Sequence, residues 1–475
     1  MNQWLSIADI AEQVQAGKLY ATDLVERSLK TIEEKADYKA IIATLEGPAR
    51  ARAKEIDRQI MQGKKVGRLA GVPFIAKDNF LVFGGETTAA SNILKGFEAP
   101  YQSSAIERLE AEGAICVAKA NLDAFGHGTS TENSDFFTTL NPHDKTRVPG
   151  GSSGGSAVAV VLGMVPFAVG TDTGGSLRQP ANFSGCVGYK PTYGLVSRSG
   201  VIAMASSTDT IGPLTRTVED AALILDVMAG QDPLDSTTIE ADKDGYEIRD
   251  TKYEIRGRKI GVIKEYMTKD VDAGVRDCIE AAVVKLKQAG AVVEDISLPA
   301  LPSALAAYYI VVPAEISSNL SRYDGQCYGY SYREAKDLRE SYDKSRSIGF
   351  GYEAKRRIMI GTYVLSSGYY DAYYKQAQTV RTKLIDEFKD AFKKVDFLLG
   401  PVAPTTAFKV GANSDPLKMY LADIMTVAAN LVGIPAISIP TGTSKGLPVG
   451  MQLMAAQRQD RRLLALACDI EGLLA

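Results

Sequence analysis

Residues 150–194 read GGSSGGSAVAVVLGMVPFAVGTDTGGSLRQPANFSGCVGYKPTYG and carry two serine-bearing glycine turns around an apolar run. The turns occupy residues 150–155 and 174–176, and the apolar run extends from Ala157 to Val169. Glycine at this density lowers stability unless the backbone needs unusual torsion angles or must approach another group closely. A flexible linker would lack the apolar middle. The stretch therefore predicts a buried segment at the centre of the fold, with serine hydroxyls of an active site at both of its ends.

The composition of the 475-residue chain is typical of a soluble globular protein, with 45% hydrophobic and 23% charged residues. The formal net charge of −3 indicates no basic nucleic-acid-binding surface. The five cysteines form no CxxC pair and are odd in number, so we expect free thiols in a reducing compartment. The N-terminus lacks signal-peptide character, and no apolar run is long enough to cross a bilayer. These features predict a cytoplasmic protein without membrane contact.

Helical and strand patterns alternate on both sides of the glycine-rich stretch. Apolar periodicity predicts helices over residues 5–35 and 47–62, and a helix at 103–113 leads into a strand at 114–118. This helix-then-strand order is typical of an α/β protein with a mainly parallel sheet. The other predicted elements are a strand ending at Lys77, a helix over 217–228, strands over 259–263 and 292–296 around a helix over 273–289, a helix-rich segment over 334–388, a strand over 397–399, a helix over 424–432 and a strand over 436–439.

We find no internal repeat and no low-complexity tract, and both sides of the charged segment 230–258 continue the same α/β pattern. We therefore predict a single domain over residues 1–475. It would consist of an N-terminal helical layer (1–65), a catalytic core (66–215), the charged connection (230–258), and the remainder of the sheet with the substrate-recognition region (259–475).

A serine hydroxyl becomes a useful nucleophile only when a neighbouring base takes its proton. His127 and His143 are the only histidines, which disfavours a Ser-His-Asp triad and a histidine-rich metal site, and we predict no metal site. A buried, neutral lysine can act as the base instead, and Lys77 ends an apolar strand. Ser152 could then relay a proton between Lys77 and Ser176.

The run Thr173-Gly174-Gly175-Ser176 would present consecutive backbone N–H groups to a developing oxyanion. Three alternatives stay open for these residues. The glycine turns could be purely structural, or they could cradle phosphate, although the GK[ST] ending of a P-loop and the GxGxxG pattern are both missing. Lys77 could also reach solvent or pair with Asp78.

The combined pattern resembles the amidase signature family. The motif consists of Lys77 in GVPFIAKDN, the turn GGSSGG at 150–155 and the run DTGGSLRQP at 172–180. The resemblance implies a triad in which Ser176 is the nucleophile, Ser152 relays the proton from a cis peptide after Gly151, and Lys77 is the general base. It also implies an α/β fold with a central mixed, twisted sheet and helices on both faces, beside the N-terminal helical layer.

Within that family the chain resembles, from end to end, the A subunits of bacterial tRNA-dependent amidotransferases. The segments that carry this likeness are 131–134, 317–325, 366–374 and 400–408. The likeness implies a glutaminase that works with B and C subunits and passes ammonia to a partner, which amidates misacylated tRNA. It implies no cofactor in this chain, and ATP and Mg on the partner. Glu-tRNA(Gln), Asp-tRNA(Asn) or both remain open as acceptors, as does the activity of the isolated chain; the alternative is a stand-alone amidase for small or aryl amides.

Glutamine recognition needs a cation for the α-carboxylate and an anion for the α-ammonium group. By resemblance, Arg357 would bind the carboxylate, Asp423 the ammonium, and Tyr308 would position the substrate. Arg356 is the adjacent competitor for the carboxylate, and each of these residues could instead form a surface salt bridge.

The segment Asp123-Ala124-Phe125-Gly126-His127 departs from the family's usual Asp-Glu-Phe-Ala-Met. An acidic side chain is missing at Ala124, and histidine replaces methionine at His127, which puts the ammonia exit and the substrate fit in question. A lone histidine is usually a satisfied structural residue, and we expect that of His127. Cys116 and Cys186 lie in apolar surroundings and are expected to be inert core thiols.

Overall fold

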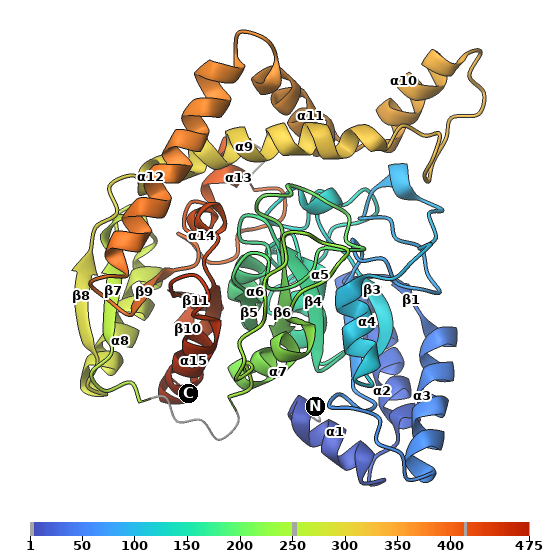
Figure 1. The fold of residues 1–475 in the computed structure, drawn as a ribbon, viewed down its shortest axis with the longest axis horizontal. Coiled ribbons are helices and arrows are strands. Elements are labelled where there is room, and N and C mark those ends of the chain that lie inside the picture. Colours follow the sequence, from blue (N-terminus) through green and yellow to red (C-terminus); the bar gives the residue numbers. More distant parts are fainter. Residues whose placement is uncertain (1–3, 249–253, 413–415, 475) are drawn as a thin grey trace.

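One mixed β-sheet runs through the computed structural model, which describes residues 4–248, 254–412 and 416–474 (Figure 1). Its eleven strands within these residues follow the order β1-β3-β2-β4-β6-β5-β10-β11-β9-β7-β8. The strands are β1 Ile41–Thr44, β2 Pro73–Lys77, β3 Ile115–Ala120, β4 Phe167–Asp172, β5 Val187–Lys190, β6 Thr210–Thr215, β7 Lys259–Ile263, β8 Val292–Ile296, β9 Phe397–Pro401, β10 Ala436–Ser444 and β11 Leu447–Met454. This confirms the expected mixed sheet.

The expectation of a mainly parallel sheet is wrong. In the part of the chain that the structure describes, β2 pairs in parallel with β3 and β4, and β7 with β8 and β9, while the other six neighbouring pairs are antiparallel. One reversal is a hairpin, since Lys445 and Gly446 join β10 to β11 with positive φ angles of 53° and 78°. Such two-residue turns favour antiparallel pairing. An apolar strand pattern records burial but carries no information on strand direction.

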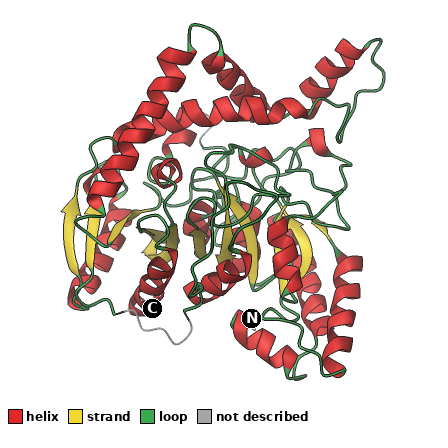
Figure 2. Cartoon of the chain, in the orientation of Figure 1, coloured by secondary structure: helices red, strands yellow, loops and turns green. Residues whose placement is uncertain are grey.

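Helices cover the sheet and extend beyond it (Figures 1 and 2). The α-helices are α1 Ile7–Gln15, α2 Ala21–Glu34, α3 Glu46–Met61, α4 Ser104–Ala111, α5 Gly154–Val161, α6 Arg178–Ser184, α7 Val218–Met228, α8 Ala273–Gln288, α9 Ala304–Asn319, α10 Leu338–Gly349, α11 Tyr352–Leu365, α12 Gln376–Ala391, α13 Pro416–Leu421, α14 Val427–Val432 and α15 Asp460–Leu474. Helices α5 and α6 pack together on the central strands, and α15 packs with α7 and α8. Helices α9 to α12 form a separate layer along the upper edge in Figure 1.

The glycine-rich stretch forms the middle of this sheet. Its apolar run divides into the end of α5 and strand β4, and α6 and β5 follow directly. Every residue of β4 and of α6 is buried. The first glycine turn therefore leads into α5, and the second follows the end of β4.

Several elements differ from the sequence-based expectation. The N-terminal layer contains a strand as well as helices, since β1 pairs antiparallel with β3. The helix expected over 424–432 begins at Val427, because residues 423–426 form a hydrogen-bonded turn. Strands β5, β6 and β11 and helices α9 and α15 were not predicted. Part of the charged connection, residues 249–253, lies outside the described residues. No helix in the described part of the chain has the length and apolar character needed to cross a membrane.

Candidate active site

Lys77 ends β2 in the interior of the sheet, where its side chain is fully buried. Its Nζ lies 2.7 Å from Ser152 Oγ, 2.9 Å from Ser153 Oγ and 2.9 Å from Thr171 Oγ1. Burial lowers the pKa of Lys77 to about 7, against the opposing effect of nearby carboxylates, of which Asp123 has the largest influence. A large fraction of this lysine is therefore neutral at physiological pH, the state in which an amine can accept a proton.

A neutral amine has two N–H donors and one lone pair. The Ser153 hydroxyl donates its own hydrogen to Thr171 O at 3.2 Å, which leaves its oxygen free to accept from the lysine. Thr171 Oγ1 accepts a second hydrogen bond, from Asn79 Nδ2 at 3.2 Å. With Ser153 and Thr171 as acceptors, the lone pair of Lys77 is left for the hydroxyl of Ser152. This arrangement can draw a proton from Ser152.

The first glycine turn holds Ser152 against the loop that follows β3. The Gly151–Ser152 peptide bond is cis, as the family resemblance implies. Asp123 N donates to Ser152 O at 3.3 Å. A Cβ on Gly151 would lie 2.2 Å from Asp123 Oδ2, so only glycine permits this approach. The turn therefore brings Ser152 to Lys77 by close backbone packing.

The second turn carries Ser176 and is organised by Asp172, the last residue of β4. The Asp172 carboxylate accepts hydrogen bonds from Gly175 N at 2.8 Å and Leu177 N at 3.1 Å. Its charge is balanced by Arg178, whose Nη2 lies 2.9 Å from Asp172 Oδ1. Despite complete burial, the pKa of Asp172 is lowered to about 2, because the attraction of Arg178 and the hydrogen bonds outweigh desolvation.

The two turns contact each other directly, because Ser153 N donates to Ser176 O at 3.2 Å. The structure thus brings Lys77, Ser152 and Ser176 into one region. Of the four N–H groups expected for an oxyanion site, that of Gly175 is already donated to Asp172. Among the described residues, the N–H groups of Thr173, Gly174 and Ser176 donate no hydrogen bond, so these three are available for an oxyanion. The hydroxyl of Thr173 donates to Asp209 at 2.7 Å, which fixes the start of the turn.

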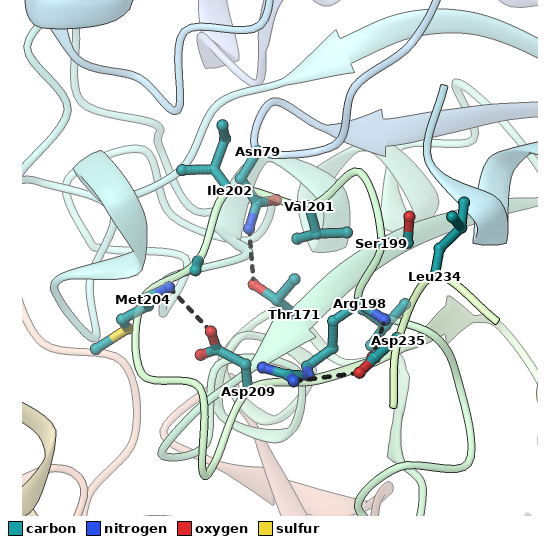
Figure 3. Close-up of a pocket in the computed structure, with 12 residues that line it drawn as sticks. Asn79, Thr171, Arg198, Ser199, Val201, Ile202, Met204, Asp209, Leu234 and Asp235 are labelled. Carbon is teal, nitrogen blue, oxygen red and sulfur yellow. Dashed lines mark hydrogen bonds and ion pairs between the residues drawn. The ribbon is translucent and has the colours of Figure 1, made fainter. Parts of the chain in front are cut away.

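A small cavity of about 170 Å³ is lined by Thr171 and Asp209, together with apolar side chains such as Val201 and Ile202 (Figure 3). Figure 3 shows Thr171, the lysine's hydrogen-bond partner, beside Asn79 in its wall, and Asp209 accepting from the backbone of Met204. Through Thr171 the cavity wall is linked to Lys77, and through Asp209 it is linked to Thr173 in the loop that carries Ser176.

Tyr308 and Asp423 lie next to the second turn. A Cβ on Gly174 would lie 2.4 Å from Tyr308 Oη, so the tyrosine covers this glycine. The hydroxyl of Thr426 donates to Gly174 O at 2.6 Å and also lies 3.1 Å from Asp423 O. Burial raises the pKa of Asp423 to about 7. The predicted ammonium ligand and the predicted positioning tyrosine are therefore anchored to the loop of the predicted nucleophile.

Arg357 projects from α11 and is 2% exposed. Its Nε donates to Glu353 Oε1 at 2.8 Å, and Arg356 pairs with the other oxygen of the same carboxylate. Both arginines line a cavity of about 240 Å³, together with Gly128, Thr129, Glu132, Asn133, Tyr309, Tyr352, Glu353, Gly411 and Met419. Because both arginines line this cavity, its lining does not decide which of them would bind the carboxylate. Arg357 is the more buried of them, since the side chain of Arg356 is 20% exposed.

Tyr309 lies next to both Arg357 and Asp423, which are predicted to bind the α-carboxylate and the α-ammonium group of the substrate. Its hydroxyl donates to Asp423 Oδ2 at 2.8 Å, and its ring centre lies 5.3 Å from the guanidinium carbon of Arg357. The Tyr420 ring stacks on it at 3.7 Å between centroids. Sequence reasoning missed Tyr309, Tyr420 and Glu353. The spacing of Glu353 three and four positions before two arginines, on a predicted helix, was the available signal.

The departures at 124 and 127 fall within this region. Ala124 is 4% exposed and begins a short 3₁₀ turn. The imidazole of His127 is completely buried, and neither ring nitrogen has a hydrogen-bond partner among the described residues. The burial agrees with the expected structural residue, whereas the expected hydrogen bonds are not formed by the described residues. Cys116 and Cys186 are buried, and burial raises the pKa of both thiols to about 12, in keeping with inert core residues. Within the described ranges, no three acidic, histidine or cysteine side chains gather as a metal site would require.

The profile of the family described as Amidase matches residues 23–464. The chain belongs to the amidase family. The A subunit of glutamyl-tRNA(Gln) amidotransferase from Geobacillus kaustophilus is 50% identical over 451 residues, covering 94% of this chain and 93% of its own. The protein of the same name from Halothermothrix orenii is 46% identical over 471 residues, covering 99% and 97%.

Solved structures of amidases agree with the fold. The A subunit of the glutamyl-tRNA(Gln) amidotransferase of Thermotoga maritima superposes with a TM-score of 0.79 at 40% identity, covering 96% of this chain and 93% of its own. A bacterial aryl acylamidase of the amidase signature family superposes with a TM-score of 0.87 at 27% identity, covering 99% and 96%. The fold is thus common to amidases with different names, and identity is higher toward the amidotransferase protein.

Proposed function

We propose that this amidase is the glutamine-hydrolysing subunit of a tRNA-dependent amidotransferase in the cytoplasm. The observation that supports this substrate class is the position of Tyr309 between two charged residues. Its hydroxyl donates to Asp423, and its ring lies against the guanidinium group of Arg357. A cation and an anion held by one side chain match the α-carboxylate and α-ammonium of a free amino acid. The names of the relatives at 46–50% identity support the same assignment.

In the proposed reaction, neutral Lys77 takes the proton of Ser152, which takes that of Ser176. The Ser176 oxygen then attacks the side-chain amide carbon of glutamine, and the free backbone N–H groups of Thr173, Gly174 and Ser176 are the donors for the oxyanion. The proton returns from Lys77 through Ser152 to the departing nitrogen, which leaves as ammonia. A water molecule, activated by the same pair, hydrolyses the ester at Ser176 and releases glutamate.

The chain would assemble with B and C subunits, and the ammonia would pass to a partner subunit that holds ATP and Mg and amidates misacylated tRNA. Glu-tRNA(Gln), Asp-tRNA(Asn) or both would be the acceptor. A stand-alone amidase for small or aryl amides shares the Lys-Ser-Ser arrangement. Such an amidase would not need both Arg357 and Asp423, because its substrates do not carry both an α-carboxylate and an α-ammonium group. The aryl acylamidase of known structure is only 27% identical to this chain.

The test is glutamine hydrolysis by the chain alone and after assembly with candidate B and C subunits and misacylated tRNA. We expect glutaminase activity that rises on assembly, and a loss of at least about 10³-fold in kcat for Ser176→Ala, because a covalent pathway is removed. Full activity of Ser176→Ala would refute the nucleophile. Hydrolysis of aryl amides in preference to glutamine, without partners, would favour the stand-alone amidase.

A further inference from the structure

Glu353 lies in the first turn of α11, three and four residues before Arg356 and Arg357, and all three residues line the cavity of about 240 Å³. Residues at these spacings share one face of a helix. Glu353 is 9% exposed and Arg357 is 2% exposed. A buried ion pair adds little net stability, because desolvation offsets most of the attraction. The effect of Glu353 on the two arginines is therefore the more informative property of this pairing.

The two arginines use different nitrogens on the Glu353 carboxylate. Arg357 Nε donates to Oε1 at 2.8 Å, whereas Arg356 pairs with Oε2 through its terminal Nη2. Glu132, the other acid of the cavity lining, accepts from Gly411 N at 2.7 Å and forms no ion pair with either arginine in the described part of the chain. Glu353 is thus the carboxylate that orients both arginine side chains.

A guanidinium group binds a carboxylate most specifically through two nitrogens of one edge, either the two Nη atoms or Nε with the adjacent Nη2. In Arg356 both edges are incomplete, because Nη2 is held by Glu353 and Nε is closed to solvent without a partner among the described residues. In Arg357 only Nε is engaged. Its two Nη atoms have no partner within the described residues and, unlike Arg356 Nε, are not closed to solvent. Arg357 therefore keeps one complete edge for a ligand, and Arg356 keeps none.

Aromatic rings add a second constraint on the Arg357 guanidinium. Its carbon lies 5.3 Å from the ring centre of Tyr309 and 5.7 Å from that of Tyr420, within the range of cation–π attraction. Glu353 holds the same group at Nε. The side chain is thus fixed from two directions before any ligand arrives, which lowers the entropic cost of binding.

We infer that Glu353 is a positioning residue for substrate recognition: by holding Arg356 at Nη2 and Arg357 at Nε, it makes Arg357 the bidentate ligand of the α-carboxylate. This assignment rests on the proposed glutaminase function and decides which of the two adjacent arginines binds. Glu353 acts through Arg357.

The kinetic test compares glutamine with 4-aminobutanamide, which keeps the amine and the amide but lacks the carboxylate, in the enzyme assembled with its partner subunits. Glu353→Met should raise KM for glutamine about tenfold with kcat within about twofold of the wild-type value, because the free edge of Arg357 is no longer held in place. The same variant should keep kcat/KM for 4-aminobutanamide within about twofold, because that substrate does not use Arg357. Glu353→Gln keeps an oxygen for Arg357 Nε and should restore KM for glutamine to within about threefold.

Glu219→Gln is the matched control. Glu219 is the second residue of α7, as Glu353 is of α11, so the variant removes the same kind of charge from the first turn of a helix. It should change the kinetics of neither substrate.

Arginine variants test the choice between the two side chains without depending on the folding of a Glu353 variant. Arg357→Gln should raise KM for glutamine at least about 30-fold, because hydrogen bonds between charged groups are lost. Arg356→Gln should raise it by no more than about threefold. Glu353→Gln added to Arg357→Gln should raise KM no further, since the glutamate acts through that arginine.

An unchanged KM in Glu353→Met, or an equal loss with both substrates, would overturn the inference. Equal effects of Arg356→Gln and Arg357→Gln, or additive effects in the double variant, would also overturn it. Absence of glutaminase in the assembled wild-type enzyme would instead defeat the proposed function.

Discussion

At the scale of single residues, burial decides the chemistry of the candidate site more than the identity of the side chains. A lysine is a poor base at neutral pH while its pKa stays near 10.5. Desolvation at the end of β2 brings that of Lys77 to about 7, and the same effect raises the pKa of Asp423 to about 7. Both groups therefore change charge in the range where the enzyme would work.

The first prediction concerns the pH dependence of glutamine hydrolysis. Lys77 acts as a base only when neutral, so kcat/KM should rise with pH, with an apparent pKa of about 7, and level off above it. Asp423 acts in the same direction, because it binds an ammonium group only when ionised, above about pH 7. Steady-state rates between pH 5.5 and 9 measure the profile.

The variant Asp423→Asn separates the two groups. Its rates should be lower at every pH, but the rise near pH 7 should persist if Lys77 is its source. A flat profile in the wild-type enzyme would contradict the assignment of the base.

At the scale of elements, glycines decide how closely the turns approach their neighbours. The turn after β4 passes under the Tyr308 ring from α9, where a Cβ on Gly174 would lie 2.6 Å from Tyr308 Cζ. Gly472 in α15 offers a contrast, because a Cβ there meets no atom within 4 Å. The same residue type thus serves close packing in one element and carries no such constraint in another.

The second prediction is that Gly174→Ala lowers kcat/KM for glutamine about 10²-fold, because Tyr308 and the nucleophile loop must separate, and a misplacement of about 1 Å at a reacting group has that effect. Gly472→Ala is the matched control. It should leave the rate unchanged and raise stability by up to about 1 kcal/mol, since alanine favours the helix. Wild-type kinetics in Gly174→Ala would show that the loop tolerates the displacement.

Patterns along the chain predict elements well where burial is continuous, as in the strand that ends at Lys77. They fail where a long-range contact decides the outcome. Strand β6 contains Gly212 and Pro213 and has little strand character by itself, yet it pairs with both β4 and β5. Its place in the sheet comes from its neighbours.

At the scale of the whole molecule, the buried ion pair of Arg178 and Asp172 connects segments from the middle of the chain to segments near its C-terminal end. Arg178 Nη2 donates to Asp172 and to Asn430 Oδ1, at 2.9 and 2.7 Å, while its Nη1 donates to Thr426 O at 3.1 Å and to Gln452. These contacts join β4 and α6 to α14 and β11, which lie far later in the chain. The nucleophile loop and the loop of Asp423 therefore share a common support.

The third prediction concerns the stability that this support provides. Arg178→Met should lower the free energy of unfolding by about 3–5 kcal/mol, because Asp172 is left as a buried charge without its partner. Denaturant titration measures it. Adding Asp172→Asn should recover part of the loss, since the unpaired charge is removed. Lys393→Ala, which breaks the exposed pair with Asp390, should leave stability unchanged within error. An equally small effect of Arg178→Met would show that the pair is not a structural support.

The sequence by itself determined the family, the mixed α/β class and the residue types of the candidate chemistry, because the serines, the glycines and the buried lysine stand in contiguous motifs. Only the tertiary structure decided which groups are free to act. It assigns the Gly175 N–H to Asp172, gives Arg356 and Arg357 one shared carboxylate, and leaves the His127 ring without a partner among the described residues. The physical reason is that hydrogen bonds and burial at these positions depend on the packing of separate elements, which local patterns do not record.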